Sequence, residues 1–304
     1  MSLAGDLHGQ QSPSADAFRS DLLMALAAVC DTPRAAASAA DALGLGAISP
    51  EEHTRAFILN CPPHAAIYLG RQGGLGGEGA DRVAGFWRAI DLVPAADVDH
   101  LSSLLALLAR LQSTDVGGRL LPPREEQALR QIRAALAWEH LWSWVPGYTR
   151  AMEDLGIPTL SLWARLTRRV LAAEVSSGLG NISDRLPTAL RDAPPPPQAT
   201  DELERLLDAL VTPVRSGLVL TSHGLARAAA TIGVGCRAGE RRFALRAMLE
   251  QNVTASLAWL SGEAERWAAR HRDSGADLAS RWWATRASRT AAVTAELAAR
   301  ATSW

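Results

Sequence analysis

The side chains of this chain that could carry out chemistry are seven histidines, three cysteines and 31 basic residues, all of them arginine. The absence of lysine excludes a Walker-type phosphate loop, a Schiff-base lysine and a Ser-x-x-Lys nucleophile. Cys30, Cys61 and Cys236 form no C-x-x-C motif, which argues against a disulfide framework or a zinc site and favours a reducing cytoplasm. No histidine pair has H-x-x-x-H spacing. We therefore expect no catalytic residue, no metal and no cofactor.

Two short motifs resemble functional signatures but lack the necessary context. Gly74-Leu-Gly76-Gly-Glu-Gly79 matches the dinucleotide pattern G-x-G-x-x-G, but only a short apolar run precedes it and no βαβ pattern follows, so a loop is expected. Arg241-Arg242-Phe243 is similar to a twin-arginine export signal, but it lies far from the N-terminus and no apolar run follows. It is interpreted as a helical face.

The overall composition excludes two further classes of partner. The net charge is −1, which argues against a broadly basic surface for nucleic acid. No apolar run reaches the roughly 18–20 residues that span a bilayer. The sequence therefore predicts neither nucleic-acid binding nor a membrane span.

Apolar residues recur at steps of three and four almost throughout, which predicts an all-α fold. Ser49-Pro50-Glu51-Glu52 is a strong helix start, and Asp97 or Asp99 is expected to cap the helix that carries Leu101 to Leu111. Val214–Leu220 is expected as one short strand. The other predicted helices are Asp16–Cys30, Pro33–Leu43, Asp81–Ile90, Pro122–Asp154 with a break or kink at Pro146, Pro158–Ser177, Asp201–Leu210, Ser222–Thr231, a long segment Ala238–Arg272, and Ala276–Ala301.

Four prolines in a row, Pro194–Pro197, mark the main internal boundary because neither a helix nor a central strand accommodates them. The predicted organisation is a disordered N-terminus (1–14), a helical body (15–192), a proline-rich spacer (193–199) and a helical C-terminal extension (200–304). The extension contains several tryptophans, too many large apolar groups for a free tail. It is expected to pack on the body or on a second copy, as a homodimer.

Four separated segments resemble the TorD/DmsD/NarJ family of redox-enzyme maturation chaperones. They occur in the family's order, with similar spacing, over about residues 15–180. The matching stretches are Cys61-Pro62-Pro63-His64 through Tyr68-Leu69-Gly70, the helix from Val83 to Phe86-Trp87, the hinge motif Pro94 to Asp99-His100-Leu101, and Glu139-His140-Leu141 with Trp144, Pro146 and Tyr148. Family members usually carry Glu four residues after the motif histidine, where this chain has Leu104.

The resemblance implies a TorD-like helical bundle, to which this chain adds the C-terminal extension. It also implies a cytoplasmic chaperone that binds the twin-arginine leader, the apo core, or both, of a molybdenum-cofactor oxidoreductase subunit. Such a chaperone assists cofactor insertion before export or assembly. The resemblance places Asp99 and His100 in or near the leader site, and Tyr68 in the same groove.

The residue chemistry is compatible with this interpretation. A twin-arginine leader needs carboxylates for its guanidinium groups and an apolar groove for the segment behind them. Carboxylates are available at Asp97, Asp99 and Glu139, and apolar walls at Tyr68, Trp87 and Trp144. Alternatively, Asp99-His100 is an N-cap with a partly buried histidine, and the protein is a helical scaffold or regulatory interaction module unrelated to molybdoenzyme maturation.

Overall fold

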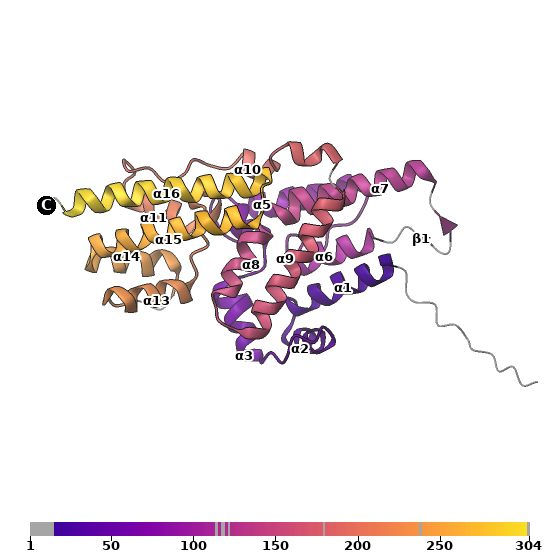
Figure 1. Ribbon diagram of the computed structural model, residues 1–304, viewed down its shortest axis with the longest axis horizontal. Helices are drawn as coiled ribbons and strands as arrows, with labels where there is room; N and C mark the ends of the chain where they lie inside the picture. The colour runs from indigo at the N-terminus through magenta and orange to yellow at the C-terminus, as the bar shows by residue number, and fades with distance from the viewer. Residues whose placement is uncertain are drawn as a thin grey trace, which may run out of the picture.

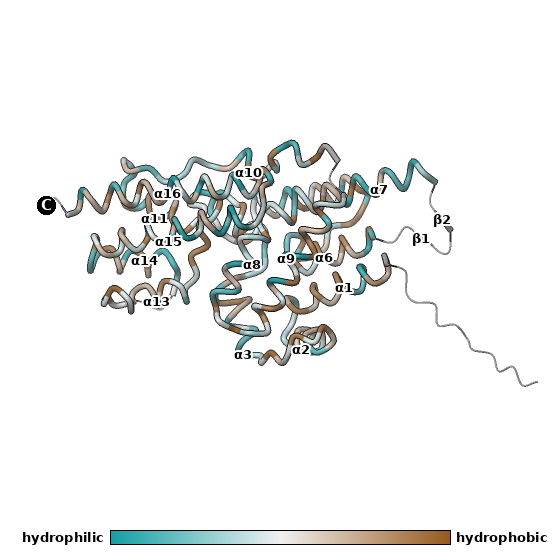
Figure 2. The backbone as a smooth tube through the Cα atoms, viewed as in Figure 1, coloured by the Kyte–Doolittle hydropathy of each residue, from teal (hydrophilic) through white to brown (hydrophobic). Residues whose placement is uncertain are grey.

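The computed structural model describes residues 15–112, 115–116, 119–120, 122–178, 180–236 and 239–302. The predicted disordered segment 1–14 lies outside the described residues. The fold is all-α, as predicted from the sequence. Its two-residue strands β1 (Asp115–Val116) and β2 (Arg119–Leu120) pair as one antiparallel hairpin. Figure 2 shows hydrophobic and hydrophilic stretches alternating along the helices, as expected for amphipathic elements packed around a core.

Among the described residues, thirteen helices precede the extension, if short and irregular ones are included. They are α1 (Ala15–Val29), α2 (Pro33–Ala42), α3 (Pro50–His53), the π-helix η1 (Thr54–Asn60), α4 (Ala65–Leu69), α5 (Gly77–Ala89), α6 (Leu101–Arg110), α7 (Pro123–Ala135), the π-helix η2 (Leu136–Trp142), α8 (Val145–Glu153), α9 (Pro158–Gly178), the 3-10 helix η3 (Gly180–Asp184) and α10 (Thr188–Arg191).

Local sequence signals explain where several of these helices begin. Ser49 forms a capping box, in which its hydroxyl accepts from the Glu52 N–H while the Glu52 carboxylate accepts from the Ser49 N–H. Thr32 caps α2, with Pro33 in the first turn. Pro146 lies in the first turn of α8, so the predicted break there is confirmed. The leucine stripe of α6 is buried as expected and packs against α1.

The extension comprises α11 (Leu203–Val211), α12 (Pro213–Ser216), α13 (Ser222–Ile232), α14 (Arg241–Gln251), α15 (Val253–Ser274) and α16 (Leu278–Thr302). In Figure 1, α15 and α16 form a long hairpin at one end of the molecule, with α13 and α14 beside it. The strand predicted at Val214–Leu220 is wrong. Pro213 begins a one-turn helix there, and Gly217, with φ 78°, ends it in a left-handed conformation.

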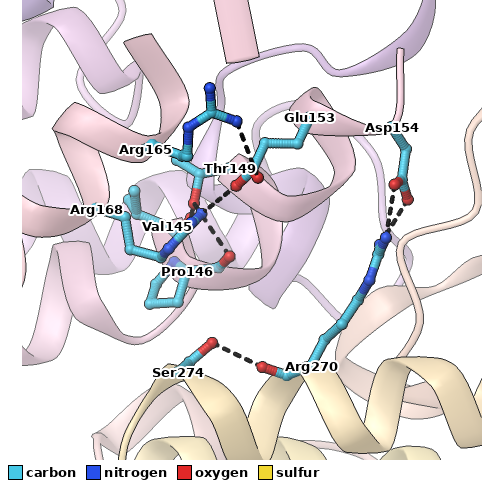
Figure 3. A network of polar contacts seen from close by, with 9 residues as sticks. All are labelled: Val145, Pro146, Thr149, Glu153, Asp154, Arg165, Arg168, Arg270 and Ser274. Atoms are coloured by element: carbon cyan, nitrogen blue, oxygen red, sulfur yellow. Dashed lines mark hydrogen bonds and ion pairs between the residues drawn. The ribbon is translucent and has the colours of Figure 1, made fainter. Parts of the chain in front are cut away.

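The extension packs directly against the helices before the spacer. Arg270 of α15 donates two hydrogen bonds to the Asp154 carboxylate, at 2.6 and 2.7 Å, and Figure 3 shows this pair beside the polar contacts between α8 and α9. The Trp283 indole donates to the Ser143 carbonyl at 2.9 Å. Buried side chains from Leu23 to Ala291 form one continuous core. The spacer itself is held by arginines, since Pro194 and Pro195 carbonyls accept from Arg286 and Arg215.

Candidate functional site

The Asp99-His100 motif joins two segments that are far apart in sequence. The Leu101 N–H donates to the Pro63 carbonyl at 2.7 Å, and the Ala65 N–H donates to the Asp99 carbonyl at 3.0 Å. The Asp99 carboxylate accepts from the Ala66 N–H at 2.8 Å, in the first turn of α4. Asp99 therefore provides a hydrogen-bond acceptor for a backbone N–H at the start of α4, a helix more than thirty residues earlier in the chain.

The predicted cap of α6 needs correction. Neither Asp97 nor Asp99 is its N-cap, because His100 takes that place and its ring Nδ1 accepts from the Ser102 N–H at 3.1 Å. An imidazole nitrogen that accepts must be unprotonated, so the neutral ring carries its proton on Nε2. Asp97 is exposed, and its carbonyl accepts from the His100 N–H.

Asp99 is buried yet ionised at neutral pH. Burial pushes its pKa upward, but the nearby His64 ring and the hydrogen bond from the Ala66 N–H leave the pKa below the ordinary value. The His64 ring Nδ1 lies 3.6 Å from the carboxylate. Because its oxygens face these two partners and only 5% of the residue is exposed, Asp99 presents no free carboxylate to a ligand in this conformation.

A pocket of about 180 Å³ opens beside this junction. We call it the His100 pocket. Its walls come from the turn after α1, from α3 and η1, from the segment before α4, from the glycine-rich loop and from the N-cap of α6. They are mainly apolar, with three imidazoles and one carboxylate: Cys30, Asp31, His53, Phe57, Ile58, Pro62, Pro63, His64, Leu75 and His100.

The histidines of the pocket form a polar edge within this apolar lining. The His64 and His100 rings meet edge to face, with centroids 4.8 Å apart. Burial lowers the pKa of His53, and burial together with the nearby His64 lowers the pKa of His100. Both rings are therefore neutral at pH 7. The His53 Nε2 is buried and has no hydrogen-bond partner among the described residues.

Exposed apolar side chains extend the lining onto the surface. Ile58 is 64% exposed, its neighbour Leu59 63% and Leu75 69%. Ile58 and Leu75 line the same pocket, and exposed apolar groups that gather in this way mark interaction surfaces in soluble proteins. Sequence reasoning missed this patch, together with Asp31 and His53. Leu75 carried a detectable signal, because it is the one large apolar residue in the glycine-rich loop 70–79.

Tyr68 and Trp144 lie beneath the pocket in the core. Their rings stack at 5.1 Å between centroids, and both side chains are buried. The Tyr68 hydroxyl donates to the Pro62 carbonyl at 3.1 Å, and the Trp144 indole donates to the His140 carbonyl at 2.8 Å. They hold the pocket wall in position and do not form the accessible aromatic wall that the sequence predicts.

Two predicted residues lie elsewhere. Glu139, in η2, accepts from the Thr188 N–H at 2.6 Å and so fixes the start of α10. Trp87 is half-buried on α5, and its indole N–H has no partner among the described residues. Of the predicted residues, the structure brings Asp99 and His100 together at the pocket and links Tyr68 to it through Pro62. It does not assemble the full set in one groove.

A comparison with protein families identifies this region. The family described as "Nitrate reductase delta subunit" matches residues 22–150. Residues 22–150 are therefore similar to the TorD/NarJ family of chaperones. The match contains every predicted site residue and every residue that lines the His100 pocket. Residues 151–304, including the whole extension, lie outside it.

The TorD/NarJ family matures molybdoenzymes and is a family of chaperones. Neither a curated protein nor a solved structure matches the chain. In the described part of the chain, no helix is both long and apolar enough to cross a membrane. The described His, Cys, Asp and Glu side chains form no group of three or more arranged to hold a metal ion.

Proposed function

We propose that this protein is a cytoplasmic chaperone that binds the twin-arginine leader, or the apo core, of a molybdenum-cofactor oxidoreductase subunit. It assists cofactor insertion before that subunit is exported or assembled. The observation that carries the proposal is the His100 pocket with its exposed apolar rim, located within the residues matched by the family. In this proposal His100 contacts the client directly, and Asp99, Tyr68 and Trp144 position the pocket wall.

The size and composition of the pocket fit a peptide side chain. About 180 Å³ is below the roughly 300–1,000 Å³ of small-molecule sites, so the pocket accepts an anchor residue rather than a cofactor. Ile58, Leu59 and Leu75 continue the apolar surface for the hydrophobic run of a leader. Asp31 is exposed and lines the pocket, so it supplies the carboxylate that a leader arginine requires.

Co-purification tests the class of partner. The tagged protein, expressed in its own host, should recover a large molybdoenzyme subunit with an N-terminal Arg-Arg leader. Recovery of an unrelated partner, with no such subunit, would favour the helical scaffold or regulatory module.

Calorimetric titration with the leader peptide of the recovered subunit tests the site. Ile58→Asp places a charge in the apolar rim and should weaken binding at least tenfold. Val93→Asp is the matched control, because Val93 is 88% exposed and does not line the pocket. It should bind like wild type. If Ile58→Asp also binds like wild type, the leader does not use this pocket.

A double-mutant cycle then tests the charge contact. Asp31→Asn should weaken binding of the Arg-Arg peptide by about 1–3 kcal/mol, since one charge-assisted hydrogen bond is lost. The same variant should not change the affinity for a peptide in which both arginines are replaced by glutamine. Equal losses for the two peptides would assign the guanidinium contact to another carboxylate.

A further inference from the structure

A second groove lies on the extension, along the first half of α16. It encloses about 440 Å³, and its lining combines apolar groups with three arginines: Leu186, Leu278, Trp282, Arg281, Arg286 and Arg289. Among the described residues, none of these arginines forms an ion pair with a carboxylate. By contrast, Arg300 farther along α16 pairs with Glu296, and Arg242 on α14 pairs with Glu204 and Asp208. The groove therefore gathers three guanidinium groups that have no carboxylate partner among the described residues.

Arg286 is the most constrained of the three. It is only 9% exposed, its guanidinium donates to the Pro194 carbonyl at 2.7 Å and lies 4.4 Å from the centroid of the Trp282 ring. Both partners are neutral, so neither cancels the charge. Burial, followed by the neighbouring Arg289 and Arg215, lowers the pKa of Arg286 to about 10. It remains charged at pH 7 in a site where an anion would be favourable.

The groove is elongated rather than focused on one point. Leu278, Trp282, Thr285 and Arg289 follow one another at steps of four, three and four, which places them on one face of α16. Arg281 and Arg289 are eight residues apart, or about 12 Å along the helix axis. Positive and apolar groups thus alternate over the length of several residues of an extended or helical peptide.

We infer that this groove is a docking site for an acidic segment of a partner protein, in which carboxylates alternate with apolar side chains. The carboxylates would pair with Arg281, Arg286 and Arg289, and the apolar side chains would pack on Trp282 and Leu278. The groove lies outside the residues matched by the family, so the inference does not rest on the proposed leader site.

Shape and charge favour a peptide over a phosphate ligand or a nucleic acid. A single phosphate needs guanidinium groups that converge, whereas these are spread along the helix. A nucleic acid needs a broad basic surface to neutralise several phosphates, and the whole chain has a net charge of −1. The apolar groups between the arginines would have no partner on a phosphate backbone.

Fluorescence anisotropy with the full-length protein tests the inference. The probe is a fluorescein-labelled 12-residue peptide of four Glu-Glu-Leu repeats, and the control probe replaces each Glu by Gln. The acidic peptide should bind at low salt, at least tenfold tighter than the control. Raising the salt concentration should weaken its binding, because exposed charge pairs are screened. Equal binding of both peptides, or no binding of the acidic one, overturns the inference.

Matched variants locate the site. The double variant Arg281→Gln, Arg289→Gln changes two exposed side chains and leaves the buried Arg286 in place, so the fold is retained. This double variant should weaken binding of the acidic peptide at least tenfold. The control double variant Arg272→Gln, Arg300→Gln removes the same charge outside the groove and should stay within twofold of wild type. Similar losses in both doubles would mean that net charge alone attracts the peptide, and would overturn the assignment.

Two further arms separate competing occupants and sites. Ile58→Asp, at the His100 pocket, should bind the acidic peptide like wild type. Weaker binding by this variant would place the peptide at the His100 pocket and overturn the assignment to the groove. A 12-nucleotide single-stranded RNA or inorganic pyrophosphate should compete weakly at most. If either displaces the peptide at lower concentration than unlabelled peptide does, the groove is a phosphate site and the inference fails.

Discussion

Asp99 is the residue at which sequence and structure differ most usefully. Its type and its place before an apolar helix are visible in the sequence, and they predict either a cap or a ligand contact. The structure makes it a cap, but of α4, and not of the adjacent α6. No local pattern encodes this, because the recipient N–H belongs to Ala66 and meets Asp99 only through the fold. The acceptor role of the Asp99 carboxylate at the start of α4 therefore could not be predicted from the sequence.

The role of Asp99 predicts a specific loss of stability. Asp99→Ala leaves the Ala66 N–H buried without an acceptor, and should lower the free energy of unfolding by about 1–3 kcal/mol at pH 7. Asp99→Asn keeps an accepting oxygen and should lower the free energy of unfolding by less than Asp99→Ala does. Urea denaturation measures both. Asp97→Asn, at an exposed position two residues away, should change the free energy of unfolding by less than about 0.5 kcal/mol.

Acid titration of the same variants provides a second readout. The folded pKa of Asp99 is below its ordinary value, so the carboxylate contributes stability at pH values above the unfolded pKa of about 3.9. That contribution is lost as the pH falls from there towards the lower folded pKa. Wild type should therefore lose its advantage over Asp99→Asn across this acid range. A constant difference between the two proteins down to pH 3 would contradict the assignment.

At the scale of elements, local chemistry predicts helix starts better than helix interiors. The capping box at Ser49 and the break at Pro146 follow from residue types alone, and both are present. The π-helices η1 and η2 were not predicted, because a shift from i→i+4 to i→i+5 hydrogen bonds leaves no clear signal in the apolar period. Val214–Leu220 was mistaken for a strand because a short buried apolar run has the same composition in either state.

His271 of α15 shows how a buried ring links elements and makes them sensitive to pH. It lies between Trp267 and Trp283, and its Nε2 is 2.9 Å from the Gly217 carbonyl at the end of α12. A carbonyl only accepts, so Nε2 carries the proton of the neutral ring. Burial, as the largest cause, lowers the pKa of His271 to about 4. His140 is lowered to about 4 in the same way.

These histidines predict destabilisation in mild acid. The unfolded chain binds protons near pH 6.5, whereas the folded rings bind them only near pH 4, so stability is full above pH 6.5 and falls as the pH falls towards 4. Each ring adds a slope of up to about 1.4 kcal/mol per pH unit. His271→Gln retains an N–H donor for the Gly217 carbonyl but has no imidazole to protonate. Between pH 6 and 5, the free energy of unfolding of this variant should therefore fall less steeply than that of wild type, by the slope that corresponds to about one proton. Unchanged slopes in urea denaturation would show that His271 protonates readily in the folded state.

At the scale of the whole molecule, the proline spacer separates two parts of the sequence that share one core. The extension meets the body through the Asp154–Arg270 pair, through Trp283 and Ser143, and through the His223 N–H, which donates to the Asn60 side chain. The sequence predicted that the tryptophan-rich extension packs on the body or on a second copy. The sequence does not distinguish these two arrangements. Composition shows that apolar surface must be covered, but it does not show which surface covers it.

Limited proteolysis tests the predicted boundary and the shared core together. Trypsin should cut first after Arg191, whose side chain is 57% exposed directly before the spacer. Because the two fragments bury apolar surface against each other, they should elute together from a size-exclusion column at neutral pH and separate only in denaturant. Mass spectrometry identifies the first cut. Full protection of residues 191–199 would contradict the boundary, and separate elution of the nicked fragments under native conditions would contradict the shared core.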